Sequence, residues 1–181
     1  MMIPFNNIAQ LASACRQSLK FQAGAVVPLP KIKVYTTPPT KSEKECLNPL
    51  FVIKNGQGEA YIPMSERESF DRALVLGLAI LLRLSPDAPD ITVKRCFEPK
   101  EQKPLLRAAG LFAACFLLPE AFLRKDLSER AWTVGDLAQK YDVLPHVIRL
   151  RLVGLGLWDA QTEQPKRLNQ ETIGCKKDLP L

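Results

Sequence analysis

The sequence predicts an α+β fold, in which a small sheet of antiparallel strands packs against helices and a compact helical segment follows. Three features of the 181-residue chain predict it. Residues 70–84 and 105–123 are apolar enough to form buried helices, and residues 49–63 have the pattern of a β-hairpin. Residues 132–158 have the pattern of two short helices joined by a turn.

The composition is that of an ordinary globular protein, with 46% hydrophobic and 24% charged residues. The 25 Lys+Arg and 19 Asp+Glu residues give a net charge of +6, which permits contact with nucleic acid or an acidic partner but is modest. Five widely spaced cysteines without a C-x-x-C pair favour free thiols, and the N-terminus lacks the pattern of a secretory signal. These features predict a cytoplasmic protein.

The stretch 70–84 is the centre of the predicted core. Between Ala73 and Leu82 no side chain is charged or hydrogen-bonding, so a helix here is apolar on every face and is expected to be buried. Ten such residues rise about 15 Å along a helix, which is about half of a bilayer core. We therefore expect a core helix rather than a membrane span. Ser65 and Glu68 match a capping box that would start it.

The other elements follow from local patterns. Asn6 or Asn7 can cap a first helix that runs to about Lys20. The remaining predicted segments are an extended stretch at 24–35, an exposed mobile loop at 36–45, hairpin strands at 49–53 and 59–63, and a strand at 91–97.

The segment 132–158 resembles a helix-turn-helix. Thr133 can cap its first helix, Val143 lies in the turn, and Pro145 suits the first turn of the second helix. Beyond it, residues 161–181 are polar and without a period, which predicts a loosely held tail.

The first apolar helix contains the pattern F-x-x-A-x-x-L-G followed by two leucines, at Phe70, Ala73, Leu76, Gly77, Leu81 and Leu82. This pattern resembles the active-site helix of the ImmA/IrrE family of zinc metallopeptidases, F-T-L-A-H-E-L-G-H-Y-L-L-H. In that helix two histidines four residues apart bind zinc, and the glutamate activates water. The two histidines correspond to Leu74 and Leu78 here, and the glutamate corresponds to Val75.

The second apolar helix resembles the family pattern E-x-x-A-N-x-F-A-A-x-L-L-M-P, with matches at Ala109, Phe112, Ala113, Ala114, Leu117 and Pro119. The glutamate that supplies the third protein ligand to zinc corresponds to Leu106. The hairpin, the two helices and the C-terminal helix-turn-helix also occur in the family's order over residues 49–158.

The resemblance implies a zincin-like domain at residues 1–125, a helix-turn-helix-like segment at 126–160 and a polar tail at 161–181. Because leucine and valine cannot bind a metal or activate water, we expect a catalytically inactive pseudopeptidase without a cofactor. Members of the family typically recognise and cleave helix-turn-helix repressors. The implied function is regulatory binding of such a repressor without cleavage, and the implied setting is a prophage or other mobile element.

Lys94 and Arg95 are the candidate partner-binding residues. In this fold class the recognition surface is the groove beside the active-site helix, where an edge strand can pair with an extended peptide. A second interpretation stays open, in which the two cations only keep an edge strand soluble.

Two other function classes also stay open. A toxin-like inhibitor of a host protein is compatible with every feature of the sequence. A direct DNA-binding regulator would use residues 132–158, with Lys140, His146, Arg149 and Arg151 as the nucleic-acid contacts. These are few cations for a DNA site, and Asp136 and Asp142 lie beside them, so the pattern favours packing or protein contact.

Overall fold

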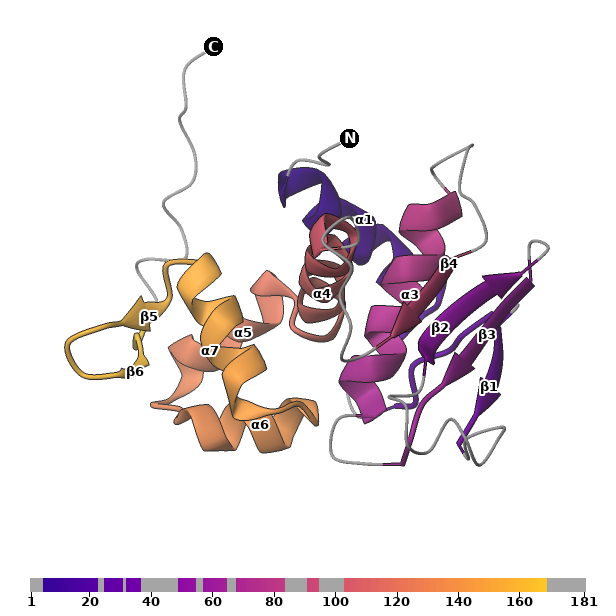
Figure 1. Ribbon diagram of the computed structural model, residues 1–181. Helices are drawn as coiled ribbons and strands as arrows, with labels where there is room; N and C mark the ends of the chain where they lie inside the picture. The colour runs from indigo at the N-terminus through magenta and orange to yellow at the C-terminus, as the bar shows by residue number, and fades with distance from the viewer. Residues whose placement is uncertain are drawn as a thin grey trace, which may run out of the picture. The chain divides into compact units, whose positions relative to one another are not determined.

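The computed structural model of the protein (Figure 1) describes residues 5–22, 25–30, 32–36, 49–54, 57–64, 68–83, 91–94 and 103–168. The chain divides into two compact units, Met1–Leu117 and Leu118–Leu181, called the N-terminal and C-terminal units below. The boundary expected between residues 125 and 126 falls inside helix α5 (Glu120–Glu129), the whole of which belongs to the C-terminal unit.

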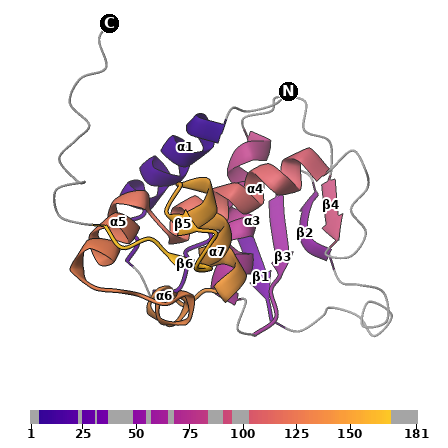
Figure 2. The same ribbon diagram turned by 90° about the vertical axis from the view of Figure 1, so that its left-hand side faces the viewer.

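The N-terminal unit is a sheet with helices on one face, as Figures 1 and 2 show. In chain order its elements are α1 (Phe5–Ser18), β1 (Ile32–Tyr35), β2 (Pro49–Lys54), β3 (Gln57–Tyr61), α3 (Glu68–Arg83), β4 (Ile91–Lys94) and α4 (Lys103–Leu117). Helix α4 packs against both α1 and α3. This mixture of helices and a small sheet agrees with the predicted α+β class.

The strands are ordered β1-β3-β2-β4. The predicted hairpin is present, because β2 and β3 are antiparallel with Val52 opposite Glu59, and β4 also pairs antiparallel with β2. The expectation that all strands are antiparallel is wrong for β1, which runs parallel to β3. Strand β3 lies between β1 and β2, and Ile32 and Val34 of β1 pack against the core. Local patterns predict strands but not their partners.

Helix α3 is the buried helix that the sequence predicts, and it begins at Glu68, close to the expected start. Val75 and Leu78 have no exposed surface. One apolar cluster joins α3 to β3 and α4, and its buried members are Ala60, Ile62, Val75, Leu78, Ala79, Leu81, Leu82 and Ala109. The packing of this cluster fixes the positions of α3 and α4 against the sheet.

The prediction of one continuous helix over 105–123 is wrong, because α4 ends at Leu117 and α5 begins at Glu120. Pro119 precedes α5 with extended angles, φ −60° and ψ 138°. Proline lacks an N–H donor and disfavours helical angles at the residue before it, so the chain breaks here.

The C-terminal unit contains α5, α6 (Val134–Tyr141), α7 (Pro145–Gly154) and the short strands β5 (Trp158–Asp159) and β6 (Gln164–Pro165). The two helices predicted for 132–158 are α6 and α7. Thr133 and Asp136 form a reciprocal capping box at the start of α6, and Pro145 is the first residue of α7. Val143 is buried in the turn between them.

The predicted tail starts too early, because β6 and the residues after it belong to the C-terminal unit. The backbone N–H of Lys166 bonds to the Leu157 carbonyl, and that of Leu168 bonds to the Leu127 carbonyl. The β5–β6 hairpin has no apolar pattern in the sequence, because backbone hydrogen bonds rather than buried side chains stabilise it. Outside the described residues lie Ser65, the rest of the tail (169–181), most of the predicted mobile loop (37–45) and the end of the strand predicted at 91–97 (95–97).

In the part of the chain that the structure describes, no single helix is long and apolar enough to cross a membrane. Pro104–Leu117 and Glu120–Glu129 reach the necessary length and composition only as a bent pair.

Candidate functional site

The four positions that the sequence resemblance pairs with zinc ligands and a catalytic glutamate belong to one apolar cluster of the N-terminal unit or pack against it. Leu74, Val75 and Leu78 come from α3, and Leu106 comes from α4. Val75 and Leu78 are members of the buried apolar cluster, and the half-buried Leu74 and Leu106 pack against it. The structure therefore places these residues of α3 and α4 at one apolar cluster.

The surroundings of these positions are apolar. The half-buried side chains that complete the cluster are Leu11, Leu29, Ile32, Val34, Leu105 and Ala108, together with Leu74 and Leu106. None of these side chains can ligate a metal or transfer a proton. Among the described residues, no group of three or more His, Cys, Asp or Glu side chains is placed to hold a metal ion.

The close approach of α3 and α4 depends on Gly77. A Cβ atom at this position would lie 2.8 Å from Cδ1 of Phe112 and 3.2 Å from the carbonyl oxygen of Ala109. Gly77 belongs to the first sequence pattern, and Phe112 and Ala109 belong to the second, so matched residues of the two patterns meet in the fold. This contact is a packing reason for those residue types, independent of any chemistry.

One of the two candidate partner-binding residues, Lys94, lies at an edge of the sheet. Lys94 is the last residue of β4, where it pairs with Pro49, and β4 is the final strand in the order β1-β3-β2-β4. Arg95 lies outside the described residues. The backbone of Lys94 therefore lies on an edge strand.

Two of the four candidate nucleic-acid contacts bond to groups within the C-terminal unit. Lys140 Nζ lies 2.6 Å from Oδ1 of the buried Asp126, whose Oδ2 accepts a 2.7 Å hydrogen bond from the Tyr141 hydroxyl. Arg151 is buried, and its Nε donates a 3.1 Å bond to the Leu118 carbonyl. Arg151 is therefore enclosed within the unit, whereas the Lys140 side chain is 39% exposed.

The other two candidates, His146 and Arg149, are exposed on α7. With Leu150 and Val153 they follow the spacing i, i+3, i+4, i+7 of one helix face. Leu150 and Val153 are 68% and 54% exposed, and the Arg149 guanidinium lies 5.0 Å from the centroid of the Trp158 ring. Over residues 118–168 there are eight Lys+Arg and seven Asp+Glu. This face is therefore mixed apolar rather than basic.

A further group, not singled out by the sequence patterns, lies on the sheet. Lys33 Nζ lies 5.0 Å from the centroid of the Tyr35 ring, and the Tyr35 hydroxyl donates a 3.4 Å hydrogen bond to Oε1 of Glu59. The hydrogen bond with Tyr35 raises the pKa of the Lys33 ammonium above its ordinary value. The alternation of polar and apolar residues in β1 is the sequence signal that would have found this face.

No protein-family model and no curated protein matches this chain.

Proposed function

We propose that the N-terminal unit is a zincin-like domain that has lost its chemistry, and that the protein works as a regulatory binding protein. The proposed partner is a helix-turn-helix repressor of a prophage or other mobile element, which the protein holds without cutting. The observation that carries this proposal is the packing of Leu74, Val75, Leu78 and Leu106 around one apolar cluster.

The packing supports a loss of chemistry because aliphatic side chains stand at the positions where a zinc site needs metal ligands and room for water. A catalytic zinc requires three protein ligands and an open position for water, inside a polar pocket. Here the corresponding side chains are aliphatic, and Val75 and Leu78 are fully buried. Full burial of a valine or leucine side chain contributes about 1.5–3 kcal/mol, so Val75 and Leu78 act as core, and the half-buried Leu74 and Leu106 pack against it.

A protein partner is favoured over duplex DNA by the contacts of the C-terminal unit. Lys140 and Arg151 are bound to Asp126 and to the Leu118 carbonyl. The exposed face of α7 offers two apolar side chains beside one arginine. Because DNA affinity depends on the number of phosphate contacts, a face with one arginine beside exposed apolar side chains disfavours duplex DNA.

The direct test uses a helix-turn-helix repressor encoded beside the gene for this chain. We expect the purified proteins to form a complex by calorimetry or size-exclusion chromatography, and the repressor to keep its intact mass after prolonged incubation. Cleavage of the repressor, or no complex at micromolar concentrations, would contradict the proposal.

Two charge-reversal variants locate the surface. Lys94→Glu with Arg95→Glu changes the β4 edge, and His146→Glu with Arg149→Glu changes the exposed face of α7. We expect only the first pair to weaken the complex. Weakening by the second pair alone would move the partner to α7, and duplex DNA binding that only the second pair removes would favour the DNA-binding alternative.

A further inference from the structure

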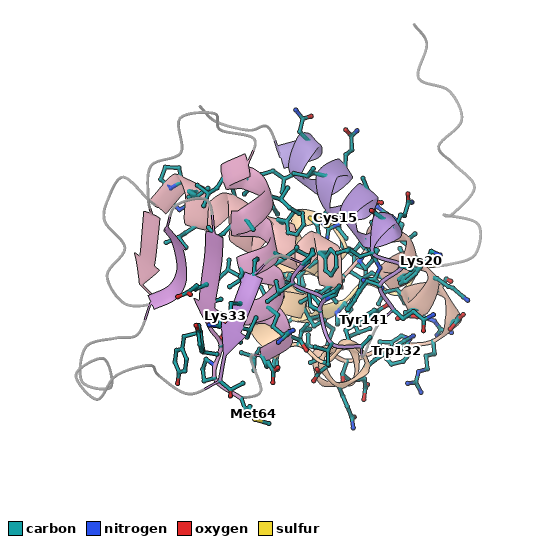
Figure 3. All side chains as sticks on the ribbon, turned by 90° about the vertical axis from the view of Figure 1, so that its right-hand side faces the viewer. Cys15, Lys20, Lys33, Met64, Trp132 and Tyr141 are labelled. Carbon is teal, nitrogen blue, oxygen red and sulfur yellow. The ribbon has the colours of Figure 1, made fainter. Side chains whose placement is uncertain are left out.

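The sheet of the N-terminal unit has one face that its helices do not cover. Ile32 and Val34 of β1 and Ala60 and Ile62, in and just after β3, contact the apolar cluster beneath α3. Because successive side chains in a strand point to opposite faces, the residues between them point away from the helices. These residues are Lys33, Tyr35, Glu59 and Tyr61, and we call them the open sheet face. Figure 3 views this side of the sheet, with Lys33 labelled on it.

The two tyrosines of the open sheet face are neighbours. Strands β1 and β3 are parallel, and their register places Tyr35 beside Tyr61 and Lys33 beside Glu59. Both tyrosines are half-buried, whereas Lys33 and Glu59 are exposed. A half-buried tyrosine ring can contact a ligand with little loss of side-chain entropy, because it has only two side-chain torsions. The ammonium of Lys33 lies 5.0 Å from the centroid of the Tyr35 ring.

The positive charge of the protein is concentrated in the same unit. Residues 1–117 contain 15 Lys+Arg and 10 Asp+Glu, so they carry five of the six net positive charges. The C-terminal unit, in spite of its two helices in helix-turn-helix order, is almost neutral. Any attraction for a polyanion is therefore expected at the unit that carries the sheet.

We propose that the open sheet face binds single-stranded nucleic acid. Successive unpaired bases stack on Tyr35 and Tyr61, and Lys33 contacts the phosphate backbone between them. Sheets that bind single strands combine aromatic stacking with cationic contacts in this way. Single strands are favoured over duplex because the bases of a duplex are already stacked and unavailable to a tyrosine ring. An acidic peptide would use Lys33 but not the two rings.

Removing the negative charge of Glu59 should increase the affinity for nucleic acid. Its carboxylate lies in register with Lys33 and repels phosphates, so Glu59→Gln should tighten binding several-fold. A face that only stabilises the sheet would not change affinity in this direction. Tyr35→Leu and Tyr61→Leu should each weaken binding about tenfold, because base stacking contributes about 1–3 kcal/mol per base. Tyr35→Phe and Tyr61→Phe keep the rings and should leave the affinity within about twofold.

The experiment measures fluorescence anisotropy of a labelled oligo(dT) and oligo(U) of about 12 nucleotides with the full chain at two salt concentrations. Lys33→Glu should weaken binding and reduce its salt dependence, whereas Arg107→Glu, the same charge change at an exposed residue of α4, should have a smaller effect. No binding at low salt overturns the proposal. Binding that the leucine variants leave unchanged, or equal affinity for a poly-glutamate peptide, also overturns it. Repressor binding by the Tyr35→Leu variant shows separately whether the function proposed above depends on this face.

Discussion

Arg16 donates a 2.6 Å hydrogen bond from Nη1 to the carbonyl oxygen of Phe116, a residue 100 positions later in the chain. Its guanidinium also lies 4.8 Å from the centroid of the Phe21 ring, and the Phe21 and Phe116 rings are 4.8 Å apart. The last carbonyls of a helix have no partner within the helix and carry its partial negative charge. A buried cation from α1 therefore satisfies the end of α4.

We expect Arg16→Leu to lower the free energy of unfolding by about 2 kcal/mol, because it removes a charge-assisted hydrogen bond from a buried carbonyl. Urea denaturation followed by circular dichroism measures the change. Arg107→Leu, at an exposed arginine of the same helix, should change stability by less than about 0.5 kcal/mol. Equal effects of the two substitutions would contradict the role assigned to Arg16.

Two glycines in neighbouring helices should respond oppositely to alanine. At Gly77 the new Cβ would lie 2.8 Å from the Phe112 ring, so Gly77→Ala must push α3 and α4 apart and should cost about 1–3 kcal/mol. At Gly110, within α4, nothing lies within 4 Å of a Cβ, so Gly110→Ala should stabilise by about 0.5–1 kcal/mol through helix propensity. Thermal unfolding of both variants tests this, and stabilisation by both would show that the helices tolerate separation.

The elements that the sequence predicts best are those with local signals. The hairpin of β2 and β3 follows from alternating residues around a glycine, and the start of α6 follows from Thr133, which can bond its own helix. Pro119 also carries a local signal, yet the apolar run on both sides of it suggested one helix. A proline outweighs such a run because it removes a backbone donor and restricts its neighbour.

The features that the sequence could not predict depend on distant partners. The parallel pairing of β1 with β3 joins segments that are distant in the sequence, and the local pattern of β1 does not specify its partner or direction. The sequence gives Arg16 and Arg151 no sign of burial. In the structure each is buried and donates a hydrogen bond to a backbone carbonyl from another part of its unit. For the candidate site, the sequence predicted that the four aliphatic residues lie on two apolar helices, while their common cluster required the packing of α3 on α4.

The capping box of α6 should make the C-terminal unit sensitive to acid. Hydrogen bonds from the Thr133 hydroxyl and backbone N–H lower the pKa of Asp136 below its ordinary value of 3.8. A carboxyl group whose pKa is lower in the folded state adds stability above the unfolded pKa, and this stability is lost as the pH falls through the folded pKa. Asp136→Asn should therefore remove part of the acid dependence of unfolding below about pH 4.

Tryptophan fluorescence reports this effect, because both tryptophans, Trp132 and Trp158, belong to the C-terminal unit. The midpoint of unfolding should depend less on pH in Asp136→Asn than in the unmodified protein. Glu163→Gln, which removes an exposed carboxylate from the same unit, serves as the control. Identical pH profiles for Asp136→Asn and the unmodified protein would refute a stabilising capping box.

The purified protein should bind no stoichiometric zinc at the α3–α4 site and show no peptidase activity. Leu74, Val75, Leu78 and Leu106 offer neither metal ligands nor a general base. Elemental analysis and digestion of a repressor substrate test this. About one zinc per chain, removed by a chelator together with an activity, would disprove it.

Introducing the zinc ligands and glutamate of the resembled family should destabilise the protein before it creates any chemistry. Leu74→His, Val75→Glu, Leu78→His and Leu106→Glu together introduce polar groups into a cluster whose other members are aliphatic. At the fully buried Val75 and Leu78, each change should cost about 3 kcal/mol or more, because it removes apolar burial and leaves polar atoms without partners.

Single variants keep this prediction measurable if the fourfold variant does not fold. Leu78→His should lower the free energy of unfolding strongly, whereas Leu78→Met, which conserves volume, should cost less than about 1.5 kcal/mol. Leu150→His, at a residue that is 68% exposed, should have little effect. Denaturation of the three variants, with zinc binding followed by calorimetry, distinguishes a filled core from an open pocket. Retained stability together with zinc uptake by the fourfold variant would mean that the α3–α4 site still has room for a metal and its water.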